Sequence, residues 1–171
     1  YAVEGDAAKG IDVLLQQPGI KGDKACIVSH TRGGYISLKA LVTHKKQEDA
    51  ISCYISYYPH WQDPNAAEPM QVYRYAVAAD ALEIPSMIVI GEYEQYQRRR
   101  SIETAVKSMK EAGRNVRLIV YPGVGRGFDF RPPHVRTFAD DLASKDAIQR
   151  AASFMASSLQ PFAKQGQSGS G

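Results

Sequence analysis

The sequence lacks several features that would have assigned it quickly to a class of protein. No apolar run reaches the 18 residues that identify a membrane-spanning helix, so we expect no contact with a membrane. The first residues, "YAVEGDAAKG", contain neither the initiator methionine nor the basic and apolar parts of a signal peptide, which indicates a processed product or a fragment. The histidines have no CxxC or HExxH pattern around them, so we expect neither a metal nor another cofactor.

Cysteine and excess charge are also scarce. Cys26 and Cys53 each lie in an apolar run, which favours buried free thiols and therefore a reducing, cytoplasmic compartment. A formal net charge of +3 is too small to predict a nucleic-acid partner. The basic stretch at 97–110 is interpreted as the solvated face of an amphipathic helix, since no stacking aromatic residues or phosphate loop accompany it.

Apolar runs alternate with segments of helical period along most of the chain. The runs predict strands at residues 24–30, 50–58, 86–92 and 116–122. The segments between and around them predict helices at 6–17, 34–45, 69–82, 97–112 and 144–159. The expected fold is therefore an α/β three-layer sandwich, in which helices cover both faces of a parallel sheet of about four strands. We expect one domain over residues 1–164 and a disordered tail over 165–171.

Three turns follow predicted strands at the edge of the sheet where open α/β proteins bind ligands. They occupy residues 29–34 ("SHTRGG"), 91–94 ("GEYE") and 121–129 ("YPGVGRGFD"). Their order matches that of nucleophile, acid and base in α/β-hydrolases.

The three turns resemble those of the dienelactone hydrolase family of α/β-hydrolases. That family typically has G-x-C/S-x-G-G at the nucleophile elbow, G-E-x-D at the acid turn and Y-P-G-x-x-H-x-F at the base loop. The resemblance covers residues 6 to about 159 and includes the scaffold positions Gly33, Gly34, Gly91, Glu92, Tyr121, Pro122, Gly123 and Phe128. It implies the α/β-hydrolase fold and, position by position, a nucleophile at Thr31, an acid at Glu94 and a base at Arg126.

All three implied catalytic positions are substituted, and position 126 is the most consequential. Arginine has no acceptor nitrogen and stays protonated, so Arg126 cannot take a proton from a nucleophile. Thr31 keeps a hydroxyl, although its extra methyl group crowds the turn. The backbone N–H of Arg32, beside Gly33, remains available as part of an oxyanion hole. We also predict an ion pair between Arg126 and Glu94, with guanidinium donors left over for a small anionic ligand.

Other side chains offer weaker alternatives. His134 is the alternative base, if its loop brings it to the cleft, whereas Ser29 precedes the tip of the turn and is disfavoured as a nucleophile. His60 and Trp61 follow the second strand, so we expect them to line the pocket.

Three functions remain open. The favoured one is a pseudoenzyme that binds a ligand or joins an assembly, and the alternatives are a weak ester or lactone hydrolase using Thr31 and a purely structural subunit. The family fold has several strands before the elbow strand, whereas this chain has room for one helix there. Strand 24–30 would then be an apolar edge, so we expect a homo-oligomer or a partner chain that completes the sheet at 24–30.

Overall fold

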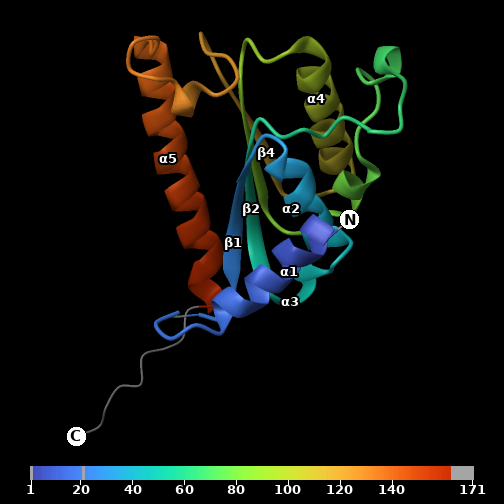
Figure 1. The fold of residues 1–171 in the computed structure, drawn as a ribbon, viewed down its shortest axis with the longest axis vertical. Helices are drawn as coiled ribbons and strands as arrows, with labels where there is room; N and C mark the ends of the chain where they lie inside the picture. The colour runs from blue at the N-terminus through green and yellow to red at the C-terminus, as the bar shows by residue number, and fades with distance from the viewer. Residues whose placement is uncertain (1, 21, 163–171) are drawn as a thin grey trace, which may run out of the picture.

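A four-stranded parallel sheet forms the centre of the molecule (Figure 1). The computed structural model describes residues 2–20 and 22–162, and the predicted tail at 165–171 lies outside them. The strands are β1 (Ala25–His30), β2 (Ile51–Tyr57), β3 (Ser86–Gly91) and β4 (Val116–Tyr121), in the order β1-β2-β3-β4. The strands are apolar on both faces because helices cover both faces, and the predicted fold class is confirmed.

The helices divide between the two faces as this strand order requires. Each strand adds beside the previous one, so right-handed crossovers bring the connecting segments to a single face. That face carries α1 (Ala2–Leu15), α2 (Gly33–Val42), α3 (Lys46–Asp49) and α4 (Tyr96–Glu111), whereas α5 (Phe138–Leu159) is the one α-helix of the described residues on the opposite face (Figure 1). No helix of the described residues is long and apolar enough to span a membrane.

Two helix predictions need correction. The helix expected at 69–82 is absent from this described segment, which instead holds the 3-10 helices Glu68–Met70 and Val77–Ala81. The helix expected at 144–159 begins earlier, at Phe138, because Thr137 and Asp140 form a capping box with each other's backbone N–H groups.

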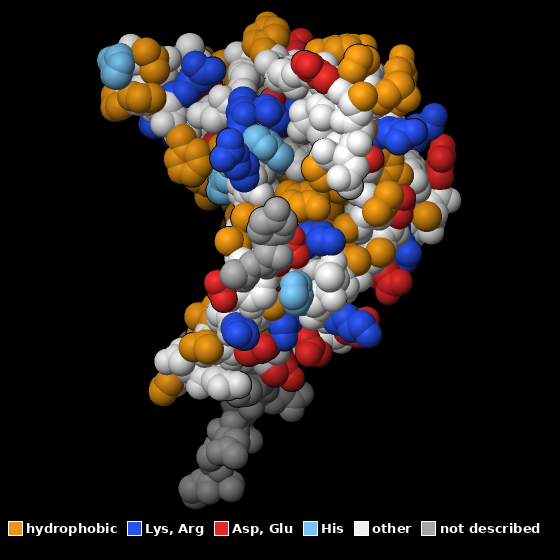
Figure 2. Space-filling view, turned by 45° about the vertical axis from the view of Figure 1, so that its right-hand side comes forward, with side chains coloured by type: hydrophobic (Ala, Val, Ile, Leu, Met, Phe, Trp, Pro, Cys, Tyr) orange, Lys and Arg blue, Asp and Glu red, His pale blue; other side chains and the backbone are white. Residues whose placement is uncertain are grey.

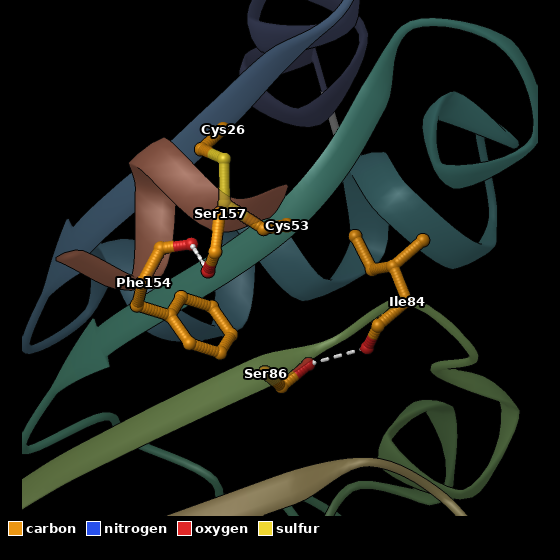
Figure 3. The surroundings of a disulfide bond; sticks show 6 residues. All are labelled: Cys26, Cys53, Ile84, Ser86, Phe154 and Ser157. Carbon is orange, nitrogen blue, oxygen red and sulfur yellow. Dashed lines mark hydrogen bonds between the residues drawn. A yellow bond between two sulfur atoms is a disulfide. The ribbon is translucent and has the colours of Figure 1, made fainter. Parts of the chain in front are cut away.

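The prediction of free thiols is wrong. Cys26 and Cys53 lie opposite each other on β1 and β2 and form a disulfide, which faces Phe154 and Ser157 of α5 (Figure 3). The apolar runs do predict burial, but two parallel strands in this register also bring the sulfur atoms together. The disulfide removes the observation that had favoured a reducing compartment.

Burial increases from the edges of the sheet toward its middle. β3 is buried along its whole length, and β2 along all but one residue. At the edges, Val28 on β1 is 45% exposed and Val120 on β4 is 36% exposed. β1 is therefore an edge strand of the described sheet.

Candidate functional site

The turn after β1 has the geometry of a nucleophile elbow. Thr31 lies at its tip with φ of 52°, a left-handed conformation that β-branched residues rarely adopt. Its N–H donates to the carbonyl of Tyr57, and its own carbonyl accepts from the N–H groups of Gly34 and His60. Backbone hydrogen bonds to β2 and α2 therefore hold Thr31 in this conformation, whatever its side chain does.

Gly34 allows the elbow to approach the end of β2 closely. A Cβ at this position would lie 2.4 Å from the Cβ of Pro59, closer than two carbon atoms can approach. At Gly33 the nearest atom would be the Cβ of Ser29, at an ordinary 3.7 Å. Only the second glycine of the pair is therefore required by packing.

A cluster of buried hydroxyl groups lies beneath the elbow, on its core side, and is hydrogen-bonded to it. Ser29 Oγ lies 2.9 Å from Ser56 Oγ and 3.1 Å from Ser37 Oγ, and Tyr54 donates to the Gly34 carbonyl at 2.9 Å. Burial raises the pKa of Tyr54, so its hydroxyl stays protonated. Ser29 is buried within this cluster, which explains structurally why it is a poor candidate for a nucleophile.

The predicted ion pair between Arg126 and Glu94 is wrong. Glu94 Oε1 instead accepts from Arg98 at 2.9 Å and from the N–H of Gln95, whereas Oε2 has no hydrogen-bond partner among the described residues. Glu94 and Arg98 are four residues apart at the start of α4, where such pairs meet easily. The acid position is thus occupied by a local ion pair rather than by a link between loops.

Arg126 instead contacts His60. Its Nη2 lies 2.6 Å from His60 Nε2, and because a guanidinium can only donate, the imidazole must accept. Burial lowers the pKa of His60 to about 4, helped by the positive charges of Arg98, Arg126 and Arg32. His60 is therefore neutral at physiological pH, and its proton-accepting nitrogen is already occupied.

Two adjoining cavities open at this edge of the sheet. One, of about 680 Å³, is lined in part by Glu94, Arg98 and Arg126. The other, of about 430 Å³, is lined in part by Arg32, His60 and Arg98, so Arg98 lies at the junction of the two. Figure 2 shows Lys or Arg and His side chains next to one another in the upper half of the molecule, where the strands end. We call the combined lining of the two cavities the arginine cleft and define it by Arg32, Arg98, Arg126 and His60.

Two predicted site residues lie elsewhere. Trp61 is fully buried and stacks on Tyr54 with ring centroids 6.5 Å apart, so its predicted place in the pocket lining is wrong. Its large apolar ring is better accommodated in the core than in a basic cleft. His134 is exposed, and none of the cavities described here has it in its lining.

Sequence reasoning missed Arg98 and a second polar group. Arg98 had been placed on a solvated helix face, although its spacing of four from Glu94 was a usable signal. Asp129 accepts hydrogen bonds from Tyr58 at 2.5 Å and from His30 at 3.1 Å, which ties the base loop to the ends of β1 and β2. These residues are 71 and 99 positions from Asp129, so no local pattern could reveal the contact.

The parallel sheet and the elbow at the end of β1 define a protein of the α/β-hydrolase class. The model of the dienelactone hydrolase family matches residues 1–159, and the chain belongs to that family. No group of His, Cys, Asp and Glu suited to hold a metal ion occurs among the described residues.

Solved structures show the same fold at low sequence identity. A Klebsiella pneumoniae subsp. pneumoniae protein assigned to the dienelactone hydrolases is 17% identical, with a TM-score of 0.67 over 90% of this chain and 61% of its own. Thermogutta terrifontis esterase 2 is 19% identical, with a TM-score of 0.67 over 95% and 67%. Carboxyl esterase 2 of Tuber melanosporum is 13% identical, with a TM-score of 0.64 over 88% and 60%. This chain thus spans about three fifths of the first and third, and no curated protein matches it in sequence.

Proposed function

We propose that this member of the dienelactone hydrolase family is a non-hydrolytic protein that binds a small anion in the arginine cleft. The observation that carries the proposal is the contact between Arg126 and His60, because it occupies the acceptor nitrogen of His60 with a group that cannot itself accept a proton. A nucleophilic hydroxyl needs a neighbouring group that accepts its proton. Arg126 cannot accept one, and burial together with three nearby guanidinium groups lowers the pKa of His60 and so opposes its protonation.

The same charges favour an anion. Arg32 and Arg126 are both exposed, and neither forms an ion pair within the part of the chain that the structure describes. Guanidinium groups bind carboxylate and phosphate oxygens through paired N–H donors. An anion in the cleft would also lie near the beginning of α2, where the partial positive charge of the helix favours it.

The alternative function is weak hydrolysis of a carboxylic ester or lactone with Thr31 as nucleophile. Two observations favour it: the elbow geometry is intact at Thr31, and several proteins of similar fold are named esterases. This reading requires a base that Arg126 and His60 do not supply.

Hydrolysis of a short activated ester separates the two functions. We expect the wild-type chain and Thr31→Ala to give the same rate, close to that of buffer with an unrelated protein. Turnover that is clearly above this background in the wild type and lost in Thr31→Ala would refute the non-hydrolytic proposal. The double substitution Thr31→Ser with Arg126→His then tests whether restoring a hydroxyl and a base restores turnover.

We also propose that the free edge of β1 pairs with another chain, either a second copy or a partner. β1 is at the sheet edge and exposes the apolar side chain of Val28, as expected of a strand that adds to another sheet. Native mass spectrometry should show an oligomer that Val28→Lys weakens. Val120→Lys on the opposite edge strand, β4, is the matched control and should leave the assembly unchanged. A stable monomer at micromolar concentration would refute pairing between copies, and a monomer that also binds no partner chain would refute the proposal.

A further inference from the structure

The arginine cleft carries more positive charge than a single carboxylate would neutralise. Arg32, Arg98 and Arg126 contribute three positive charges, and Glu94 contributes the nearby negative one that pairs with Arg98. Arg131, which lines the larger cavity, has its own carboxylate partner in Asp140. Neither Arg32 nor Arg126 forms an ion pair among the described residues, and although the charge of Glu94 also acts on Arg126, three positive charges in the cleft face this one negative charge.

His60 adds no charge but fixes the position of one guanidinium. Its Nε2 accepts from Arg126 Nη2 at 2.6 Å, which uses one of five N–H donors and leaves the others for a ligand. Arg32 comes from the N-terminal end of α2 and lines the adjoining cavity together with His60. Donors from two directions suit a tetrahedral group with three or more oxygens better than a planar carboxylate.

On the basis of the proposed anion-binding function, we infer that the ligand of the arginine cleft is a doubly charged oxyanion, of the phosphate-monoester class, rather than a singly charged carboxylate. One negative charge would leave one of the two guanidinium groups uncompensated, whereas a dianion neutralises both. The inference concerns the charge and shape of the ligand, so it can fail while the proposed anion binding stands.

Calorimetric titration with matched oxyanions tests this directly. Sulfate and methanesulfonate are both tetrahedral, but they carry two charges and one charge, respectively, throughout the range from pH 5 to pH 7.5. At constant ionic strength we expect sulfate to bind the wild-type chain at least about tenfold more tightly. Equal affinities would overturn the dianion inference and leave the proposed function intact. No binding of either anion would overturn both.

Glycerol phosphate adds a test within one ligand. Its second pKa is about 6, so the dianion falls to about a tenth of the total at pH 5. His60, with a pKa lowered to about 4 chiefly by burial, stays neutral across this interval, while the guanidinium groups of Arg32, Arg98 and Arg126 stay charged. The affinity for glycerol phosphate should therefore fall about tenfold from pH 7.5 to pH 5 while that for sulfate changes little. An unchanged affinity for glycerol phosphate would contradict the inference.

Single substitutions locate the site. Arg126→Gln and Arg32→Gln should each weaken sulfate binding about tenfold and narrow the preference for sulfate over methanesulfonate, because one uncompensated charge remains. Arg100→Gln is the control, since Arg100 lies on the exposed side of α4 and pairs with Glu103 outside the cleft. Arg32 and Arg126 are both exposed, and each variant can be checked by its thermal midpoint. An unchanged sulfate preference in both folded variants would place the binding elsewhere and refute the inference.

Discussion

The elbow and the base loop meet at the same edge of the sheet but depend on different interactions. The elbow is held by backbone hydrogen bonds and by the close approach of Gly34 to Pro59. The base loop also has backbone hydrogen bonds, such as that from the Tyr93 N–H to the Val124 carbonyl, but Asp129 and Arg126 tie it to the elbow side through side chains, which contact Tyr58, His30 and His60. A backbone-defined turn keeps its shape when the side chain at its tip changes, whereas a side-chain-defined loop changes its chemistry with a single residue. The elbow geometry therefore persists at Thr31 even though position 126 no longer holds a base.

The largest expected effect concerns the disulfide that ties the elbow strand to β2. It closes a loop of 27 residues, and reducing it should lower the free energy of unfolding by about 3–4 kcal/mol. Unfolding the oxidised and the reduced chain with guanidinium chloride measures the difference in their free energies of unfolding. A Cys26→Ala, Cys53→Ala variant should resemble the reduced chain and lose its sensitivity to reductant. Equal stability of the oxidised and reduced chain would show that the disulfide does not hold β1.

Gly34→Ala should break the elbow while leaving the base loop intact. The new Cβ would lie 2.4 Å from Pro59 Cβ, so the turn must shift, at a cost of about 3 kcal/mol. Gly33→Ala is the matched control, since its Cβ meets nothing closer than 3.7 Å and its stability should change by less than about 0.5 kcal/mol. Thermal unfolding distinguishes them, and similar losses in both would contradict the packing argument.

Asp129→Asn should loosen the base loop and spare the elbow. The carboxylate accepts two hydrogen bonds from groups on or after β1 and β2, so we expect a loss of about 2 kcal/mol. Burial by itself would raise the pKa of Asp129, but the hydrogen bonds from His30 and Tyr58 lower it below its ordinary value.

The lowered pKa gives this contribution a defined pH dependence. A carboxyl group with a lower pKa in the folded state stabilises the fold fully above its unfolded pKa, near 3.8. The stabilisation is lost as pH falls from there through the folded pKa. Urea titrations between pH 2 and pH 6 should therefore show a steeper acid loss in the wild type than in Asp129→Asn. Parallel curves would show that Asp129 is not the group responsible.

The smallest effect is expected from Thr31→Asn. Asparagine tolerates a left-handed φ better than a β-branched residue does, so the variant should gain about 0.5–1 kcal/mol. Thr31→Val, which keeps the branching without the hydroxyl, is the control and should show no gain. A stability loss in Thr31→Asn would indicate that the threonine hydroxyl itself stabilises the turn.

The sequence predicts the strands better than it predicts what packs on them. Apolar runs locate all four strands to within a few residues, because burial on both faces requires apolar residues throughout. The segment at 69–82 has the composition of a helix but contains only short 3-10 turns, since its backbone contacts, such as Ala76 N–H to the Trp61 carbonyl, come from elsewhere in the chain. The disulfide likewise depends on the register of β1 against β2, which the cysteine positions do not specify.

The sequence by itself determined the fold class, the family resemblance and the inability of Arg126 to serve as a base, because these follow from residue type and order. Only the tertiary structure decided the partners of the charged side chains. Arg126 contacts a histidine 66 positions away instead of Glu94, and Glu94, in the turn before α4, pairs with Arg98 in the first turn of that helix. Charged side chains are long and flexible, so the same sequence is compatible with several different pairings of charged groups. The choice among them depends on which loops the sheet brings together and how deeply each group is buried.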